Sequence, residues 1–239
     1  MGHVSDVVVV TGAASGLGAV YCRELAAAGY TVVGADVAAV DGVDLAVAVD
    51  VRDREETERL AGQVLERFGR IDALVNNAAV YSSIVKKPFE EITDEEWDDV
   101  MSVNVKGAWL CARAVAPAMR RQRRGKIVNI SSTTVPTAPP GFAHYVASKA
   151  AIVGLTRALA RELGPDGICV NTLTPDYIAF DRDYDSRQPD MAAALAAQRV
   201  FAREQVPEDM IGALLFLVGR GSDFVTGQDI WVNGGRAFH

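Results

Sequence analysis

The sequence predicts an α/β protein: one domain, residues 1–239, built on a doubly wound parallel sheet of about seven strands. Short runs of Val, Ile and Leu alternate with longer helical patterns along the whole chain. The runs are almost continuously apolar, as expected for strands that helices cover on both faces. No internal repeat, linker or low-complexity tract divides the 239 residues, so one domain with a large core is the simplest interpretation.

The first unit of this alternation is the most informative. A strand is expected at residues 7–10, a glycine-rich turn at 11–18, a helix up to Gly29, and a second strand at 30–33 that ends near Asp36. A glycine-rich turn at a helix N-terminus offers bare backbone N–H groups and the positive end of the helix dipole to a pyrophosphate. An acid after the second strand can accept hydrogen bonds from the hydroxyls of an adenosine ribose. An ordinary strand-to-helix turn is the alternative, but the order of strand, turn, helix, strand and acid favours a dinucleotide site.

Asp36 also indicates which nicotinamide cofactor binds. A 2′-phosphate on the ribose would face a like charge there, and no Arg or Lys stands at positions 13–15 or 37. The sequence therefore favours NAD over NADP. The alternative for Asp36 is a turn acid that follows a strand.

The later elements continue the pattern. Further strands are expected at residues 45–49, 71–75, 126–130, 168–173 and 229–232. Helices are expected at residues 54–68, 93–119, 144–163, 191–204 and 207–219. The helix after residue 93 begins with a capping box of Thr93 and Glu96. Residues 176–190 are rich in Asp, Tyr and Arg and interrupt the alternation, so we expect a substrate lid at about 176–205.

Polar and turn-forming residues cluster where the strands end. Ligands in an open parallel sheet bind beyond the C-terminal ends of the strands. Six features fall at those ends: the Gly12 turn, Asp36, Asp50, Asn77, Ser132 and Pro175. Their coincidence is a stronger argument for a binding site at this edge than any single motif.

Composition limits the partners. The net charge of −7 argues against a nucleic acid or an anionic membrane surface as the main partner, and no apolar stretch approaches the ~18 residues that span a bilayer.

The three cysteines lie within apolar segments, so we expect reduced core residues of a cytoplasmic protein. The three histidines have no metal-ligand spacing. Asp181-x-Asp183-x-Asp185 lacks the Gly and Glu of a calcium loop, so no metal is expected.

Tyr145 and Lys149 are the first candidates for chemistry. They lie four residues apart on one predicted helix, so their side chains share a face. A free phenol has a pKa of about 10, and a nearby ammonium lowers it by favouring the phenolate. Tyr145 is therefore a candidate acid and base near neutral pH, and Lys149 can also donate to the nicotinamide ribose. The same pair alone is usually just a surface pair.

Ser132 and Asn104 strengthen that hypothesis. Ser132 ends a strand at the ligand-binding edge, where a hydroxyl can hold a substrate oxygen against Tyr145. A turn or helix cap is the alternative for this serine. Asn104 lies mid-helix, where an amide is unexpected unless it is paired, and it could hold a water that links Lys149 to solvent.

Taken together, these motifs resemble the short-chain dehydrogenase/reductase family. The resemblance rests on Thr11-Gly12-x-x-x-Gly16-x-Gly18, Asn76-Asn77-Ala78, Asn104, Ser132, Tyr145-x-x-x-Lys149 and Asn171…Pro175, in the family's order and spacing. It implies a Rossmann fold, a homotetramer or homodimer, and hydride transfer between the nicotinamide C4 and a carbinol carbon.

The resemblance also implies roles for individual residues. The catalytic set is Asn104, Ser132, Tyr145 and Lys149, with Tyr145 as acid/base and Ser132 orienting the carbonyl. The cofactor-binding residues are Gly12, Ser15, Gly16, Leu17, Gly18, Asp36, Asp50, Val51, Asn77, Tyr145, Lys149, Pro175 and Ile178.

Three positions depart from the family pattern. Ala79 and Asp176 stand where Gly is usual, and Phe180 stands where a Thr often hydrogen-bonds the nicotinamide carboxamide. Alanine stays small, and Asp tolerates unusual backbone angles better than most residues. The Phe180 side chain has no group that could make the hydrogen bond of that Thr.

Within the family, further residues resemble NAD-dependent secondary-alcohol dehydrogenases, some of which oxidise aryl carbinols such as 1-phenylethanol. These residues include Tyr81 after the Asn-Asn-Ala motif and His144 before Tyr145. By this resemblance Ser132, Tyr145 and Tyr81 contact a small alcohol or ketone substrate; a half-exposed loop aromatic is the equal alternative for Tyr81. An NADPH-dependent 3-oxoacyl-thioester reductase and a non-catalytic dinucleotide-binding regulator remain as rival functions.

Overall fold

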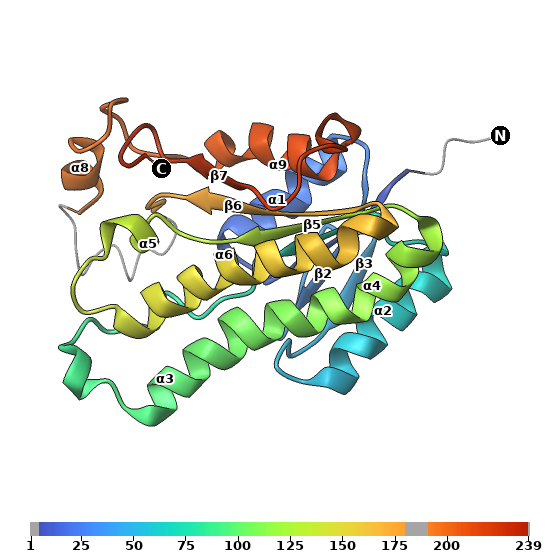
Figure 1. Ribbon diagram of the computed structural model, residues 1–239, viewed down its shortest axis with the longest axis horizontal. Helices are drawn as coiled ribbons and strands as arrows, with labels where there is room; N and C mark the ends of the chain where they lie inside the picture. The colour runs from blue at the N-terminus through green and yellow to red at the C-terminus, as the bar shows by residue number, and fades with distance from the viewer. Residues whose placement is uncertain (1–4, 180–190, 239) are drawn as a thin grey trace.

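One parallel sheet organises the molecule. The computed structural model describes residues 5–179 and 191–238, and its seven strands pair in the order β3-β2-β1-β4-β5-β6-β7 (Figure 1). The strands are β1 (Val7–Thr11), β2 (Thr31–Asp36), β3 (Leu45–Ala48), β4 (Ala73–Asn76), β5 (Gly125–Ile130), β6 (Ile168–Pro175) and β7 (Asp229–Val232). Every pair is parallel. The order reverses between β1 and β4, which confirms the predicted doubly wound sheet and places the switch point beside the glycine turn.

Helices cover both faces of this sheet. They are α1 (Gly16–Ala27), α2 (Arg54–Phe68), α3 (Asp94–Met101), α4 (Ala108–Gln122), α5 (Thr134–Thr137), α6 (Ala143–Leu163), α8 (Met191–Ala196) and α9 (Ile211–Val218). Short 3₁₀ turns lie at Phe89–Glu91, Gly164–Asp166, Pro207–Met210 and Arg220–Ser222. Helices α2, α4 and α6 cover one face, and α1 and α9 cover the other (Figure 1).

Strand β1 shows why the sequence runs unbroken in valine. Val7 and Val9 join the core under α2, α4 and α6, whereas Val8 and Val10 join the core under α1 and α9. Successive side chains of a strand point to opposite faces, so a strand covered on both sides must be apolar at every position. The three cysteines are buried and unbridged, as predicted.

Two predicted helices differ from the structure. The predicted helix at residues 191–204 is wrong beyond residue 196, because the following segment is held to the end of β6 by side-chain bonds of Arg199 and Gln205. The predicted continuous helix after Thr93 contains a π-helical turn, Ser102–Gly107, between α3 and α4. The capping box that starts it is confirmed: Thr93 Oγ1 accepts from the Glu96 N–H at 3.2 Å, and Glu96 Oε2 accepts from the Thr93 N–H at 2.9 Å.

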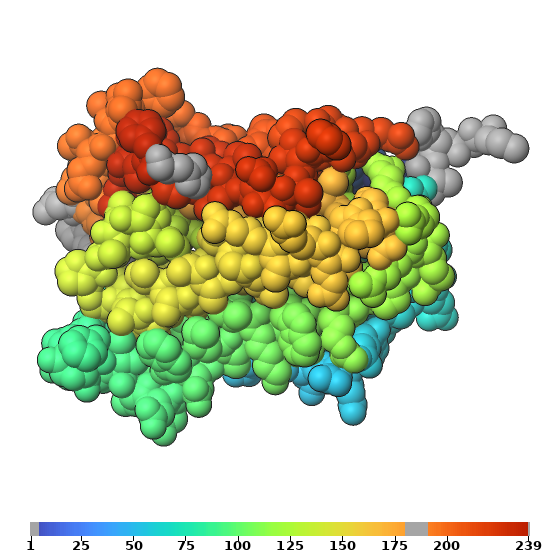
Figure 2. Space-filling view, in the orientation of Figure 1, coloured from blue at the N-terminus to red at the C-terminus, as the bar shows by residue number. Residues whose placement is uncertain are grey.

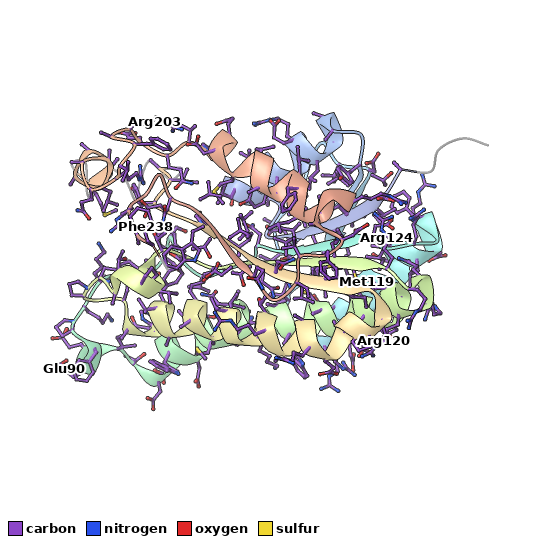
Figure 3. The ribbon with its side chains drawn as sticks, turned by 45° about the horizontal axis from the view of Figure 1, so that its top comes forward. Glu90, Met119, Arg120, Arg124, Arg203 and Phe238 are labelled. Atoms are coloured by element: carbon purple, nitrogen blue, oxygen red, sulfur yellow. The ribbon has the colours of Figure 1, made fainter. Side chains whose placement is uncertain are left out.

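The amino ends of the strands lie at one end of the molecule, and the carboxyl ends lie at the other. In Figure 3, Arg120 and Arg124 lie at one end of the molecule, and Arg203 and Phe238 lie at the other. Arg124 pairs there with Asp6, which precedes β1, so this end carries the amino ends of the strands. Within residues 5–179 and 191–238, no helix has both the length and the apolar character that crossing a membrane requires.

Candidate active site

A cleft of about 940 Å³ opens at the carboxyl ends of the strands. Its size lies within the range of pockets that hold small ligands and cofactors. The predicted site residues in its lining are Gly12, Ser15, Gly16, Leu17, Asp36, Asp50, Val51, Asn77, Tyr81, Ser132, Tyr145, Lys149, Pro175 and Ile178. Two predicted site residues, Gly18 and Asn104, lie outside the lining. The structure thus brings together residues from all parts of the chain.

The glycine turn requires its glycines for steric reasons. Gly12 has a φ of +65°, and a Cβ there would lie 2.7 Å from the Ala78 Cα. A Cβ at Gly18 would lie 1.9 Å from the Gly12 carbonyl oxygen, so only a glycine there lets the turn close. Asn77 Nδ2 holds the turn from the end of β4, donating to the carbonyls of Thr11 and Gly12 at 3.1 and 3.0 Å.

This tight turn leaves the N-terminus of α1 facing the cleft. Ser15 is the N-cap, and its side chain makes no capping bond. The first turn of α1 carries no acidic residue, so its free N–H groups and positive dipole end meet no competing charge. The turn therefore fits a diphosphate group.

Asp36 is held in place by the backbone. Its Oδ2 accepts from the Ala14 N–H at 2.9 Å and its Oδ1 from the Ala38 N–H at 3.0 Å. A carboxylate has about four lone-pair sites, so both oxygens can still accept from the hydroxyls of a ribose.

Arg52 is a lining residue that the sequence analysis missed. Its Nε and Nη2 donate to Asp50 at 2.7–3.0 Å, and its Nη1 donates to Asp99 at 3.1 Å. The bonds from Arg52 lower the pKa of Asp50 below its ordinary value. Two carboxylates surround this one guanidinium, so the part of the cleft that they share with Asp36 stays acidic.

Tyr145 and Lys149 are buried together on α6. The Lys149 Nζ lies 5.7 Å from the centroid of the Tyr145 ring and donates to the Ile130 carbonyl at 2.8 Å. Burial lowers the pKa of Lys149 to about 8. An amine with that pKa is still mostly protonated at neutral pH, so a cation stands beside the phenol.

Ser132 follows β5, and the cap interpretation of its side chain is confirmed, whereas its contact with a substrate stays a prediction. Its Oγ accepts from the Thr134 N–H at 3.2 Å, which is a local cap. Accepting that bond leaves the hydroxyl hydrogen for an acceptor in the cleft, since the hydroxyl donates to no residue within the described part of the chain.

Asn104 lies in the π-helical turn and is fully engaged. Its Oδ1 accepts from the Val80 N–H at 2.8 Å, and its Nδ2 donates to the Ser148 Oγ at 3.0 Å. Ser148 in turn donates to the Tyr145 carbonyl at 2.7 Å. Asn104 therefore ties the loop at Val80 to α6 beside Tyr145, as single π turns at functional sites often do. The predicted role in holding a water stays a prediction.

Aromatic rings form one wall of the cleft beside Tyr145. The Tyr81 ring centroid lies 5.2 Å from that of Tyr145, and the Phe142 centroid lies 5.9 Å from it. Ile84 and Val100 pack behind these rings. This wall suits an apolar or aromatic group next to the phenol.

The departures from the family pattern have different outcomes. Ala79 lines the cleft. Asp176 is buried among Thr133, Arg199 and Arg236, three partners that the sequence analysis missed because they come from distant segments. Phe180 and the acids at 181–185 lie outside the described residues.

Within the described ranges, no group of His, Cys, Asp and Glu side chains could hold a metal ion.

Comparison with known proteins agrees with this geometry. A family model described as enoyl-(acyl carrier protein) reductase matches residues 12–237. The 3-oxoacyl-[acyl-carrier-protein] reductase FabG of Staphylococcus aureus is 36% identical, covering 95% of this chain and 96% of the relative. The enzyme of the same name from Thermotoga maritima is 34% identical, with 96% of both chains covered. The crystal structure of levodione reductase superimposes with a TM-score of 0.89 at 28% identity, covering 97% of each chain.

Proposed function

This chain belongs to the short-chain dehydrogenase/reductase family, and from that premise we propose that it is an NAD-dependent oxidoreductase that interconverts a secondary alcohol and a ketone. One observation carries the proposal: the buried pair of Tyr145 and Lys149 borders the same cleft as Ser132 and the glycine turn. An acid/base, a hydrogen-bond donor and a dinucleotide site in one cleft are what hydride transfer to or from a carbinol carbon requires.

The residues present fit a nicotinamide dinucleotide. The glycine turn and the N-terminus of α1 would hold its diphosphate, and Asp36 its adenosine ribose. When bound, NAD supplies the acceptor for the hydride from the carbinol carbon, and its reduced form supplies the hydride in the reverse direction. The choice of NAD over NADP rests on the carboxylate of Asp36, which a 2′-phosphate would have to displace or meet as a like charge.

The protein's own groups handle the proton. In the oxidative direction, Tyr145 as phenolate takes the proton from the alcohol oxygen as the carbon–oxygen double bond forms. Lys149 makes this feasible near neutral pH because its ammonium stabilises the phenolate. The Ser132 hydroxyl donates to the same substrate oxygen and fixes its position. In the reductive direction, Tyr145 returns the proton to the oxygen.

We further propose a hydrophobic or aryl carbinol as the substrate. The aromatic wall of Tyr81 and Phe142 beside Tyr145 supports this, as does the apolar contribution of Met191 and Leu195 to the lining. Such walls bind an apolar body, while the few polar groups orient it.

A second candidate is a 3-oxoacyl-thioester reductase that uses NADPH. The names of the relatives from S. aureus and T. maritima favour that substrate class. Asp36 argues against a 2′-phosphorylated cofactor. A non-catalytic dinucleotide-binding regulator is the remaining alternative, and the complete set of Asn104, Ser132, Tyr145 and Lys149 argues against it.

The test is a turnover assay read by NADH absorbance. Purified protein is given a panel of secondary alcohols with NAD or NADP, and the corresponding ketones and a 3-oxoacyl thioester with NADH or NADPH. We expect turnover of secondary alcohols and ketones, faster with NAD(H). Faster turnover of the thioester with NADPH would favour the second candidate. Binding of NADH with no turnover of any substrate would favour the regulator.

A further inference from the structure

A buried cluster of charges closes the end of β6. Both oxygens of Asp176 are occupied: Oδ2 accepts from Arg199 Nε and Nη2, each at 2.8 Å, and Oδ1 accepts from Arg236 Nη1 at 2.5 Å and Thr133 Oγ1 at 2.6 Å. The Asp176 side chain is fully buried, and those of Arg199 and Arg236 are 2% and 12% exposed. The carboxylate has no capacity left for a further cation.

The cluster carries one excess positive charge. Two guanidinium groups share one carboxylate, and arginine does not lose its proton in proteins. Four of the five N–H donors of Arg199 are used, since its Nη1 and Nη2 also donate to the carbonyls of Arg203 and Tyr177 at 2.9 and 3.0 Å. Arg199 is therefore the more completely bonded of the two, and most of the unused donors of the cluster belong to Arg236.

Arg236 has an unused donor edge. Its Nε is buried without a hydrogen-bond partner, and within residues 5–179 and 191–238 its Nη1 bond to Asp176 is the only hydrogen bond of the guanidinium. A buried donor that is left unpaired is costly, and more so when it carries charge. Because Nε is sealed from solvent, the nitrogen that can meet a ligand in the cleft is Nη2, whose N–H donors make no hydrogen bond to the described residues.

The position of Arg236 assigns this edge to the substrate end of the cleft. Asp176 and Arg236 both line the cleft, and Thr133, which donates to Asp176, is the residue after Ser132. Figure 3 shows Phe238, two residues beyond Arg236, at the same end of the molecule as Arg203. The glycine turn follows β1, three strand spacings from β6 or roughly 14 Å, so a diphosphate at α1 lies too far away to be the counter-ion.

We propose that Arg236 binds a carboxylate on the substrate, so that the natural substrate is an apolar or aryl ketone or carbinol that also carries an anionic group. This inference rests on the proposed function and adds the substrate's charge to it. Tyr81, Phe142 and Leu195 receive the apolar body, and Ser132 and Tyr145 receive the reacting oxygen. Asp176 holds the guanidinium in place without cancelling the whole charge of the cluster.

The first test measures binding without turnover. The probes are 3- and 4-acetylbenzoate, 3-benzoylpropanoate and the matching neutral amides, titrated calorimetrically into the enzyme–NAD complex, which cannot reduce a ketone. We expect at least one carboxylate to bind about 10- to 100-fold more tightly than its amide, the range for a charge-assisted hydrogen bond. Arg236→Gln should abolish that preference and Arg236→Lys should keep part of it.

The controls separate the possible failures. Arg23→Gln changes an exposed arginine on α1 and should leave the preference unchanged. Equal binding of every carboxylate and its amide to the wild type, or an unchanged preference in Arg236→Gln, would overturn the role of Arg236. Weaker NADH binding in Arg236→Gln with an unchanged preference would assign the residue to the cofactor instead. NADH-absorbance assays with the same ketones test the proposed function separately, because failure to turn over any probe leaves the binding result standing.

Discussion

Tyr145 is the residue on which the proposed chemistry depends. Its ring lies near both the ammonium of Lys149 and the ring of Tyr81, on a helix that side-chain bonds of Ser131 and Lys149 hold to the end of β5. The backbone thus fixes the phenol in the cleft before any ligand arrives, which is the preorganisation that proton transfer needs.

Replacing Tyr145 by Phe removes only the hydroxyl. We expect Tyr145→Phe to lower kcat by about 10²- to 10⁴-fold, the usual contribution of a general acid/base. The affinity for NADH should change little, because the ring and Lys149 remain. Steady-state assays and a fluorescence titration with NADH measure the two quantities. Turnover within about threefold of the wild type would rule out the assigned role.

Asp36 should determine the choice of cofactor. In Asp36→Asn the like charge that opposes a 2′-phosphate is gone, while the neighbouring backbone donors remain. We expect the ratio of kcat/KM for NADH over NADPH to fall by about 10- to 100-fold, in line with the strength of a hydrogen bond to a charged group. Asp41→Asn, an exposed acid in the loop after β2, is the matched control. An unchanged ratio would show that another residue selects the cofactor.

Two elements depend on single polar side chains. The π-helical turn Ser102–Gly107 places Asn104 where it bonds the loop at Val80 and the start of α6. At the other side of the cleft, Asp176 joins β6 to the segment after α8 and to the chain end. Each is a polar contact between segments far apart in the sequence, so each holds the cleft walls at a set distance.

Asp176 should be essential to the stability of this region. Although burial alone raises its pKa, hydrogen bonds from Thr133, Arg236 and Arg199 outweigh that effect and hold the pKa below its ordinary value. Asp176→Ala leaves two buried guanidinium groups without a counter-ion, so we expect a loss of about 3–5 kcal/mol in the free energy of unfolding. Urea denaturation measures it. Asp41→Ala should cost far less, and equal losses in both variants would contradict the argument.

At the scale of the whole molecule, Lys149 couples stability to pH. Its pKa falls from 10.5 to about 8 on folding. Burying the protonated amine therefore costs roughly 3 kcal/mol below pH 8, and this cost disappears as pH rises from 8 to 10.5. We expect the gain in unfolding free energy of Lys149→Met over the wild type to be largest at and below pH 8. That gain should fall by about 3 kcal/mol by pH 10.5. Denaturation at several pH values measures the difference in unfolding free energy between the variant and the wild type. A difference that stays constant from pH 8 to pH 10.5 would contradict the burial argument.

We expect the outer face of α4 and α6 to be a contact surface between subunits. The two helices form adjoining bands across one face of the molecule (Figure 2), with the half-exposed Trp109 in a groove of about 480 Å³ beside Pro117 and Leu159. We expect a homotetramer or homodimer, that is, a mass of four or two times 25.5 kDa in light scattering. Trp109→Glu should lower that mass at micromolar concentration. A monomeric wild type would refute the expectation.

Much of this architecture follows from local sequence. The unbroken valines of β1 predict a strand that is buried on both faces. The glycine spacing predicts a tight turn, because a Cβ would clash there, and the Thr93–Glu96 box predicts a helix start through reciprocal capping bonds. The end of α8 and the π turn were not predictable, because contacts with β6, Val80 and Ser148 override helix propensity there.

The sequence by itself determined the fold class, the glycine-rich turn with Asp36 after the next strand, and the pairing of Tyr145 with Lys149. Each is encoded within a few dozen consecutive residues by periodicity, sterics or helical spacing. Only the tertiary structure decided that Arg52 sits between two acids and that Arg236 shares Asp176 with Arg199. Those outcomes depend on which charges meet when remote segments come together: Asp99 reaches Arg52 at a half-exposed position, and Arg199 and Arg236 meet Asp176 in the interior.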